Sequence, residues 1–314
     1  MKFLRFKDND GEKNKNNNNN NHHDSNIKSG YLENNKVFGL KNDILDYFNQ
    51  DYDEIIKDVD NSYNLEDIKI ISPVSPSKIV CIGLNYKDHA EELNMELPDT
   101  PKLFIKPSTS VIGNNDDIIK PEMSNEIDYE GELAIVIGKK AKNIEVDQSK
   151  DYIFGYTIIN DVTARDVQRY DEQWTRGKSF DTFAPIGPVI ETELNPQNQK
   201  IITRILKNNN INDKDLVGED LNNYNSKSTI ASVKKDNKIN SEIKNQTEIR
   251  QNSNTSNMVF GAYELVSFIS KVMTLNPGDV IATGTPPGVG QIKIGETVEV
   301  EIEDIGVLSN RLID

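Results

Sequence analysis

Short runs of β-branched and aromatic residues, bounded by Gly, Pro and Asn, recur along most of this chain and are typical of β-strands. Two stretches have helical spacing instead, residues 88–97 and the amphipathic residues 263–275. Strands outnumber helices and do not alternate with them regularly, which argues against a doubly wound parallel sheet. We therefore predict a β-rich α+β fold, a roll or sandwich with a few peripheral helices. Its main strands are expected at residues 78–86, 102–107, 130–138, 152–161, 183–192, 199–207, 279–286 and 296–310.

The N-terminal residues predict a small module of their own. Residues 1–6 alternate apolar and basic side chains, as an edge strand does, and 31–40 predict a second short strand before the helix-like stretch 43–59. A turn-rich linker follows. We accordingly divide the chain into an N-terminal module at 1–70 and a larger domain at 71–314.

Two Asn-rich tracts interrupt these patterns, at residues 8–30 and at about 208–252. Of the 39 Asn in the chain, 13 lie in the first fifty residues and 10 in residues 201–250. Such tracts bury too little apolar surface to offset their ordering entropy, so we predict an exposed loop in the N-terminal module and a low-complexity insertion in the larger domain. His22 and His23 favour a solvated loop over a metal site, and a regulatory interaction segment is the alternative for the second tract.

Composition indicates which kinds of partner and which cellular compartment to expect. The 36 Lys and Arg stand against 51 Asp and Glu, giving a net charge of −15 and a pI of about 4.8, so we expect no nucleic-acid and no anionic-membrane partner. Cys81 is the only cysteine in the sequence, which excludes an internal disulfide and a Cys-based zinc site and fits a reducing compartment. The sequence shows no apolar run of spanning length, secretory signal or evident mitochondrial presequence, so a cytoplasmic location is expected, with a mitochondrial location as the alternative.

The sequence IDYEGELAIVIG contains the strongest local signal for chemistry. Glu130 and Glu132 stand two apart at the start of an apolar strand, so their side chains share one face. Two crowded carboxylates repel each other unless a cation or a proton lies between them, and hard divalent ions prefer oxygen ligands. Asp161, directly after the apolar strand 152–160, offers a third carboxylate. The alternatives are a solvent-facing pair on an edge strand for the glutamates and a helix N-cap for Asp161.

Two further motifs carry candidate groups. His89 and Glu92 are three apart on the predicted helix, where a carboxylate would orient the imidazole and raise its basicity, as a general base requires. The sequence DVIATGTPPGVG places Thr283, Thr285 and several glycines in a tight loop after a strand, where backbone N–H groups can meet an anion. It lacks the Gly-Lys-Ser/Thr of a P-loop. An exposed helix pair and a plain hairpin turn are the alternatives.

Six ordered segments together resemble the fumarylacetoacetate hydrolase family, from about Lys78 to the C-terminus apart from the second Asn-rich tract. They are IGLNYKDHAEEL, DYEGELAIVIGKK, GYTIINDVTARDVQ, RGKSFDTFAPIGP, NTSNMVF and PGDVIATGTPPGVG. The resemblance implies a mixed β-sandwich roll that forms a homodimer. It also implies a divalent cation held by Glu130, Glu132 and Asp161, namely Mg²⁺, with Ca²⁺ or Mn²⁺ as alternatives.

The same resemblance implies roles for further side chains. His89 and Glu92, on a short lid helix, would activate water, and Lys178 would stabilise developing negative charge. Thr285 would contact a substrate carboxylate. The implied substrate-binding residues are Asn85, Tyr86, Arg165, Gln168 and Thr285.

From these roles we predict a metal-dependent hydrolase that cleaves a C–C bond in a small β-diketo acid of the acylpyruvate or fumarylacetoacetate type. Hydrolysis of such an acid passes through an enolate that a divalent cation can stabilise. An oxaloacetate tautomerase or decarboxylase using the same site is the first alternative. A non-catalytic cation-binding protein is the second.

Overall fold

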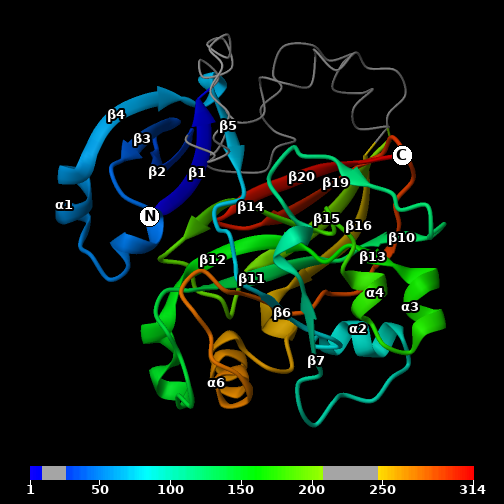
Figure 1. The fold of residues 1–314 in the computed structure, drawn as a ribbon. Coiled ribbons are helices and arrows are strands. Elements are labelled where there is room, and N and C mark those ends of the chain that lie inside the picture. The colour runs from blue at the N-terminus through cyan, green and yellow to red at the C-terminus, as the bar shows by residue number, and fades with distance from the viewer. Residues whose placement is uncertain (9–25, 208–246) are drawn as a thin grey trace.

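The computed structural model describes residues 1–8, 26–207 and 247–314, and the strands of these segments form three sheets (Figure 1). The pair His22 and His23, and most of both Asn-rich tracts, lie outside the described residues. The mixed, sheet-rich α+β architecture predicted from the strand pattern is confirmed.

The longest sheet has twelve strands, and most neighbours in it are antiparallel. Along the main path they are β4 (Val59–Asn64), β3 (Lys36–Leu40), β2 (Ile27–Glu33), β1 (Lys2–Asp8), β14 (Ala184–Glu191), β12 (Ile153–Asn160), β11 (Gly131–Ile137), β17 (Val280–Ala282), β6 (Ile79–Ile82) and β7 (Leu103–Lys106). Off this path, β5 (Ile68–Ile71) pairs with β1, and β8 (Val111–Ile112) pairs with β14. The sheet therefore runs without a break from the N-terminal strands to those that carry the predicted acids.

A five-stranded sheet packs against β11, β12 and β14 of the long one. Its strands are, in order, β16 (Thr247–Asn254), β15 (Lys200–Leu206), β19 (Thr297–Ile302), β20 (Gly306–Ile313) and β9 (Ile118–Ile119). A small third sheet contains β13 (Thr163–Ala164), β10 (Ile127–Tyr129) and β18 (Gly290–Gln291).

Short helices surround these sheets, and Figure 1 shows α2, α3 and α4 grouped beside β7. The α-helices are α1 (Tyr52–Ile55), α2 (Lys87–Glu92), α3 (Arg165–Asp171), α4 (Thr175–Lys178) and α6 (Ala262–Val272). The 3₁₀ turns are η2 (Ile44–Tyr47), η3 (Ile56–Asp58), η4 (Leu65–Asp67), η5 (Ser108–Ser110), η6 (Val146–Tyr152) and η9 (Thr255–Asn257). Within the described segments, no helix has the length and apolar character needed to cross a membrane.

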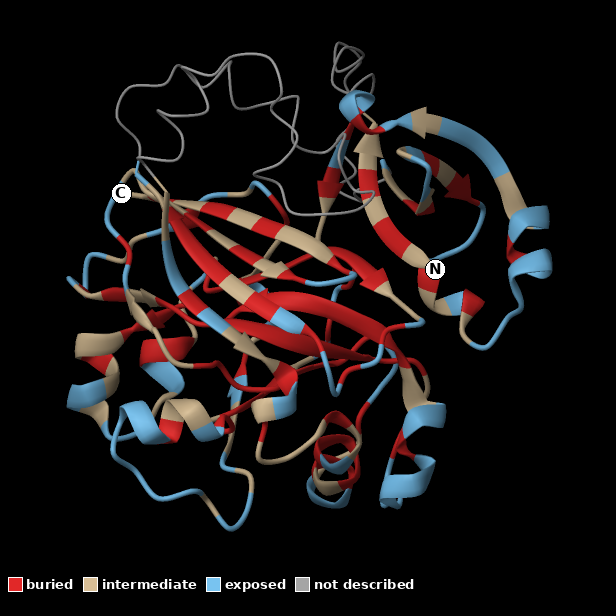
Figure 2. Cartoon of the chain, turned by 180° about the vertical axis from the view of Figure 1, so that it is seen from behind, coloured by how far each residue is buried: buried red, intermediate tan, exposed pale blue. Residues whose placement is uncertain are grey.

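Strand β11 lies in the interior, as its red colour in Figure 2 shows. Leu133 and Ile135 pack into one cluster of buried apolar residues, and Ala134 and Val136 into another. Alternate side chains point to opposite faces of a strand, so both faces of β11 are covered. This explains why the sequence here is an unbroken apolar run instead of an alternating one.

Several expectations for the N-terminal residues were wrong. Strand β1 is interior, between β2 and β14, because its apolar side chains, Phe3 among them, are buried by strands distant in the sequence. The single strand expected at 31–40 is two strands, because Asn34 and Asn35 adopt positive φ values of 50° and 62° and reverse the chain. The helix-like stretch 43–59 forms only short helical turns.

Both Asn-rich tracts were predicted too long. Strand β2 begins at Ile27, inside the expected loop, and β16 begins at Thr247, inside the expected insertion. In each case the neighbouring strand continues the ladder, pairing Lys7 with Ile27 and Leu206 with Thr247. Backbone pairing across a hairpin thus orders residues whose side chains alone indicate a loop. The division of the chain at residue 70 stays a prediction.

Candidate active site

Three acidic side chains meet in the interior beside the long sheet. Glu132 belongs to β11, Glu130 directly precedes that strand, and Asp161 directly follows β12. The pairing of Gly131 with Asn160 brings the ends of the two strands together. One carboxylate oxygen from each acid lies within 4.8 Å of the others, and all three residues are buried. The solvent-facing alternative for the glutamates does not hold, because β11 lies between β12 and β17.

Two buried lysines face these acids. Lys178, the last residue of α4, donates from Nζ to Glu130 and to Asp161, each at 2.8 Å. Lys106, the last residue of β7, donates from Nζ to the other oxygen of Asp161 at 2.5 Å and to the carbonyl of Val162 at 2.9 Å. Such charge-assisted bonds fix the orientation of the carboxylates before any ligand arrives.

Arg165, at the start of α3, closes one side of the cluster. Its guanidinium donates to Glu130, to Asp128 at 2.8 Å and to the side-chain oxygen of Gln168 at 2.6 Å. The structure therefore places Arg165 against a predicted metal ligand, and Gln168 joins the site through Arg165.

The two glutamates have opposite electrostatic surroundings. Burial would raise the pKa of Glu130, yet Lys178 and Arg165 lower it to about 2. For Glu132, burial raises the pKa well above its usual range, and the charges of Asp161 and Glu130 raise it further. Among the described residues, neither lysine nor Arg165 donates a hydrogen bond to Glu132, whose carboxylate accepts only from the amide of Gly284.

This donor set fits a hard divalent cation. Three carboxylates converge, all the donor atoms are oxygens, and burial and the neighbouring acids raise the pKa of Glu132 despite the charge of Lys178. Mg²⁺, Mn²⁺ and Ca²⁺ all bind such oxygen ligands. Glu130, Glu132 and Asp161 are thus the residues that would hold the ion.

The Gly-Thr-Pro loop after β17 joins these acids to the predicted catalytic pair. His89 Nδ1 lies 2.9 Å from a carboxylate oxygen of Glu92 on α2. The amide of Gly288 donates to Glu92 at 3.0 Å, and the amide of Gly284 donates to Glu132 at 2.7 Å. The N–H groups of this loop, which were expected to meet an anion, therefore bond to two of the protein's own carboxylates. One is Glu132 of the acid cluster, and the other is Glu92 of the His89–Glu92 pair.

Two predicted substrate contacts use their side chains within the protein. The hydroxyl of Thr285 donates to the carbonyl of Gly131 at 2.9 Å and accepts a bond from Gln251 at 2.7 Å. The amide of Asn85 is buried and donates to the carbonyl of Thr283 at 2.7 Å. Both side chains hold the loop in place, and their contact with substrate stays a prediction.

Tyr86 differs from these two. Its side chain is fully buried, and its hydroxyl has no hydrogen-bond partner among the described residues. Burial raises the pKa of this hydroxyl well above its usual range, and Glu132 and Asp88 raise it further. A buried hydroxyl without a partner fits a group that bonds to a ligand or to water in the working protein.

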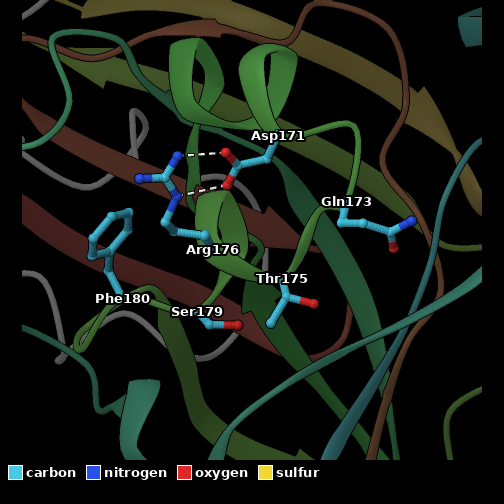
Figure 3. A pocket seen from close by; sticks show the side chains of 6 residues that line it. All are labelled: Asp171, Gln173, Thr175, Arg176, Ser179 and Phe180. Carbon is cyan, nitrogen blue, oxygen red and sulfur yellow. Dashed lines mark hydrogen bonds and ion pairs between the residues drawn. The ribbon is translucent and has the colours of Figure 1, made fainter.

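A surface hollow lies beside α4 (Figure 3). Its lining residues are Asp171, Gln173, Thr175, Arg176, Ser179 and Phe180, and the figure shows Arg176 paired with Asp171. None of the three clustered acids lines it, so it is distinct from the carboxylate site.

Sequence patterns missed two residues that shape this site. Lys106 lies within the predicted strand 102–107, where a lysine in an apolar run was the available signal. Gln251 lies inside the tract predicted as an insertion, and only the pairing of β16 with β15 reveals its place. Both act through partners more than thirty residues away in the sequence.

Comparisons with known proteins identify the family to which this chain is similar. The family model described as Fumarylacetoacetate (FAA) hydrolase C-terminal matches residues 78–313. The chain is 40% identical over 275 residues to a fumarylacetoacetate hydrolase domain-containing protein 2 homolog of Dictyostelium discoideum, covering 83% of this chain and 81% of that protein. It is 38% identical over 258 residues to a rat protein named oxaloacetate tautomerase Fahd2a, mitochondrial, covering 78% of this chain and 70% of that protein.

A solved structure extends the comparison to a ligand-bound protein. The crystal structure of fumarylpyruvate hydrolase from Pseudomonas aeruginosa in complex with Mn²⁺ and pyruvate superposes with a TM-score of 0.61 at 26% identity. The match covers 78% of this chain and 91% of that one.

Proposed function

The chain belongs to the fumarylacetoacetate hydrolase family, and from that premise we propose that it is a divalent-metal-dependent enzyme acting on a small 2-oxo acid. The reaction that we propose first is the keto-enol tautomerisation of oxaloacetate. Relatives that are 36–38% identical carry the name oxaloacetate tautomerase. The observation that carries the proposal is the buried cluster of Glu130, Glu132 and Asp161 beside the Lys178 ammonium.

A divalent cation held by the three acids would polarise the 2-oxo carbonyl of the substrate as a Lewis acid. The ammonium of Lys178 supplies a second positive charge beside Glu130 and Asp161. Burial would lower its pKa, but Asp161 and Glu130 raise it above the usual value, so this side chain keeps its proton and can donate to a developing oxyanion.

His89 is the candidate for moving a proton. Its Nδ1 faces Glu92, which leaves Nε2 as the nitrogen that can take a proton from a substrate carbon and return it. Glu92 is itself held by the amide of Gly288, so the imidazole is oriented through a carboxylate with a fixed position.

C–C hydrolysis of an acylpyruvate is the second candidate, in which His89 Nε2 would take a proton from water instead of carbon. The likeness to fumarylpyruvate hydrolase favours it. Decarboxylation of oxaloacetate would use the same groups. A 2-oxo acid as ligand, Mg²⁺ as the ion, a homodimer and a cytoplasmic location stay predictions.

One assay panel tests the proposal. Metal-loaded protein is given enol-oxaloacetate, keto-oxaloacetate, acetylpyruvate and fumarylpyruvate, with loss of enol absorbance, pyruvate release and CO₂ release followed in parallel. We expect tautomerisation to be the fastest reaction and to fall at least about 100-fold in His89→Gln, within the usual contribution of general acid–base catalysis.

The matched variants separate catalysis from simple ion binding. His89→Gln should bind Mn²⁺ like the wild type, and the exposed Glu122→Gln should keep both turnover and ion binding. No turnover of any of the four compounds by the metal-loaded wild type would favour the non-catalytic alternative and overturn the proposal.

A further inference from the structure

The side chain of Gln251 on β16 bonds to two parts of the site at once. Its Oε1 accepts from the amide of Gly131 at 3.0 Å, and its Nε2 donates to Thr285 Oγ1 at 2.7 Å and to the carbonyl of Pro286 at 2.8 Å. The residue is completely buried. All three bonds require a carboxamide in one orientation, with its oxygen toward the N–H group and its nitrogen toward two acceptors.

One of these parts is the strand that carries the carboxylate cluster, and the other is the loop that bonds to both Glu132 and Glu92. Gly131 lies between Glu130 and Glu132 on the strand of the acids, while Thr285 and Pro286 belong to the loop whose amides bond to Glu132 and Glu92. Thr285 also donates to the carbonyl of Gly131, so Gln251, Thr285 and Gly131 form a closed ring of hydrogen bonds.

The backbone around Gln251 packs without room for adjustment. A Cβ on Gly288 would lie 2.0 Å from the carbonyl oxygen of Arg250, and Gly288 has a φ of 95°. A Cβ on Gly131 would lie 2.4 Å from the hydroxyl of Thr203 on β15. The loop and the acid strand therefore both rest against the five-stranded sheet, and Gln251 fixes their separation there.

We propose that Gln251 is a positioning residue. It fixes the position of the His89–Glu92 pair relative to the carboxylate cluster, acting through Thr285 and the Gly-Thr-Pro loop. This inference rests on the proposed function for its kinetic readout. It predicts that losing the bonds to the loop impairs catalysis more than ion binding, because the acids are also held by the β11–β12 ladder.

Two substitutions at residue 251 distinguish the bond to Gly131 from the bonds to the loop. Gln251→Met keeps the length of the side chain and loses every bond, whereas Gln251→Glu keeps the acceptor for Gly131 and loses the donor for Thr285. Because the loop is the part that carries the effect, we expect kcat to fall about 100-fold in both, the scale of a 1 Å misplacement. The Kd for Mn²⁺ should stay within about threefold of wild type.

A double-mutant cycle distinguishes positioning from general destabilisation. If Gln251 acts through Thr285, Gln251→Met combined with Thr285→Val should lower kcat little more than either change alone. Gln199→Met makes the same change at another buried glutamine, which should leave kcat unchanged. Among the described residues, the side chain of Gln199 donates to the carbonyl of Asn195 and has no hydrogen bond to the three acids or to the Gly-Thr-Pro loop.

Hydrogen exchange tests the inference without any turnover. In Gln251→Met, the amides of Gly284, Thr285 and Gly288 should exchange at least tenfold faster than in wild type, with β11 and β12 unchanged. Wild-type exchange in this loop would overturn the inference even if the enzyme is active, as would fully additive effects on kcat in the double mutant. Faster loop exchange in a protein that turns over no 2-oxo acid would instead count only against the proposed function.

Discussion

At the scale of single residues, the two glutamates of the site have different hydrogen-bond partners. Glu130 bonds to Lys178 and Arg165, so its charge is compensated within the protein. Glu132 accepts a bond from the amide of Gly284, a neutral donor. The sequence pattern predicted that the two glutamates share a face, since alternation is local. It could not predict this difference, because Arg165 and Lys178 belong to α3 and α4, which are distant from the glutamates in the sequence.

The raised pKa of Glu132 predicts a pH-dependent stability in the metal-free protein. Its folded-state pKa lies above the unfolded value of roughly 4.3, so between the two the folded state binds more protons and the free energy of unfolding falls as pH rises. Glu132→Gln should remove this contribution. We expect the free energy of unfolding of the variant to exceed that of wild type at pH 8, and by less at pH 5.

Urea unfolding of chelator-treated protein across this pH range measures the difference. Glu122→Gln, an exposed glutamate, provides the control and should follow the wild-type curve. A stability difference between Glu132→Gln and wild type that does not change with pH would contradict the assignment.

At the scale of elements, the main strands after residue 77 were predictable where continuous or alternating apolar runs end at Gly, Pro or Asn. Their neighbours were not, since pairing is set by contacts between distant segments. Strand β1 looks like an edge strand until β14 pairs with it, and β16 looks like part of a polar tract until β15 does. Lys106 and Gln251 were missed for the same reason.

The β15–β16 hairpin leads to a prediction about the second Asn-rich tract. Leu206 and Thr247 are paired, so the two ends of residues 208–246 lie at the same end of one hairpin. A linker of about four residues in place of 208–246 can therefore join the strands. We expect this variant to keep its near-UV circular dichroism and its Mn²⁺ affinity.

A longer deletion serves as the contrast. Replacing 208–251 by the same linker also removes residues 247–251 of β16, Gln251 among them, and should abolish turnover. Loss of Mn²⁺ binding in the shorter replacement would show that the hairpin needs the tract.

At the scale of the whole molecule, the acidic surplus and the low hydrophobic fraction of 35% have separate explanations. Much of the polar composition lies in the two Asn-rich tracts, whereas the described residues bury two large apolar clusters. Of the 51 acids, three gather beside Lys106, Lys178 and Arg165, and Arg165 also pairs with Asp128, so four carboxylates face three cations. The interior of the fold thus contains the carboxylates that we propose as the cation ligands.

Calorimetric titration of Mn²⁺ into chelator-treated protein tests the central claim most directly. Wild type should bind one ion per chain, and Glu132→Gln, which keeps the shape of the side chain but removes its negative charge, should weaken that binding at least about 100-fold, or roughly 2.7 kcal/mol. Wild-type affinity in Glu132→Gln, or no saturable binding to the wild type, would contradict the account.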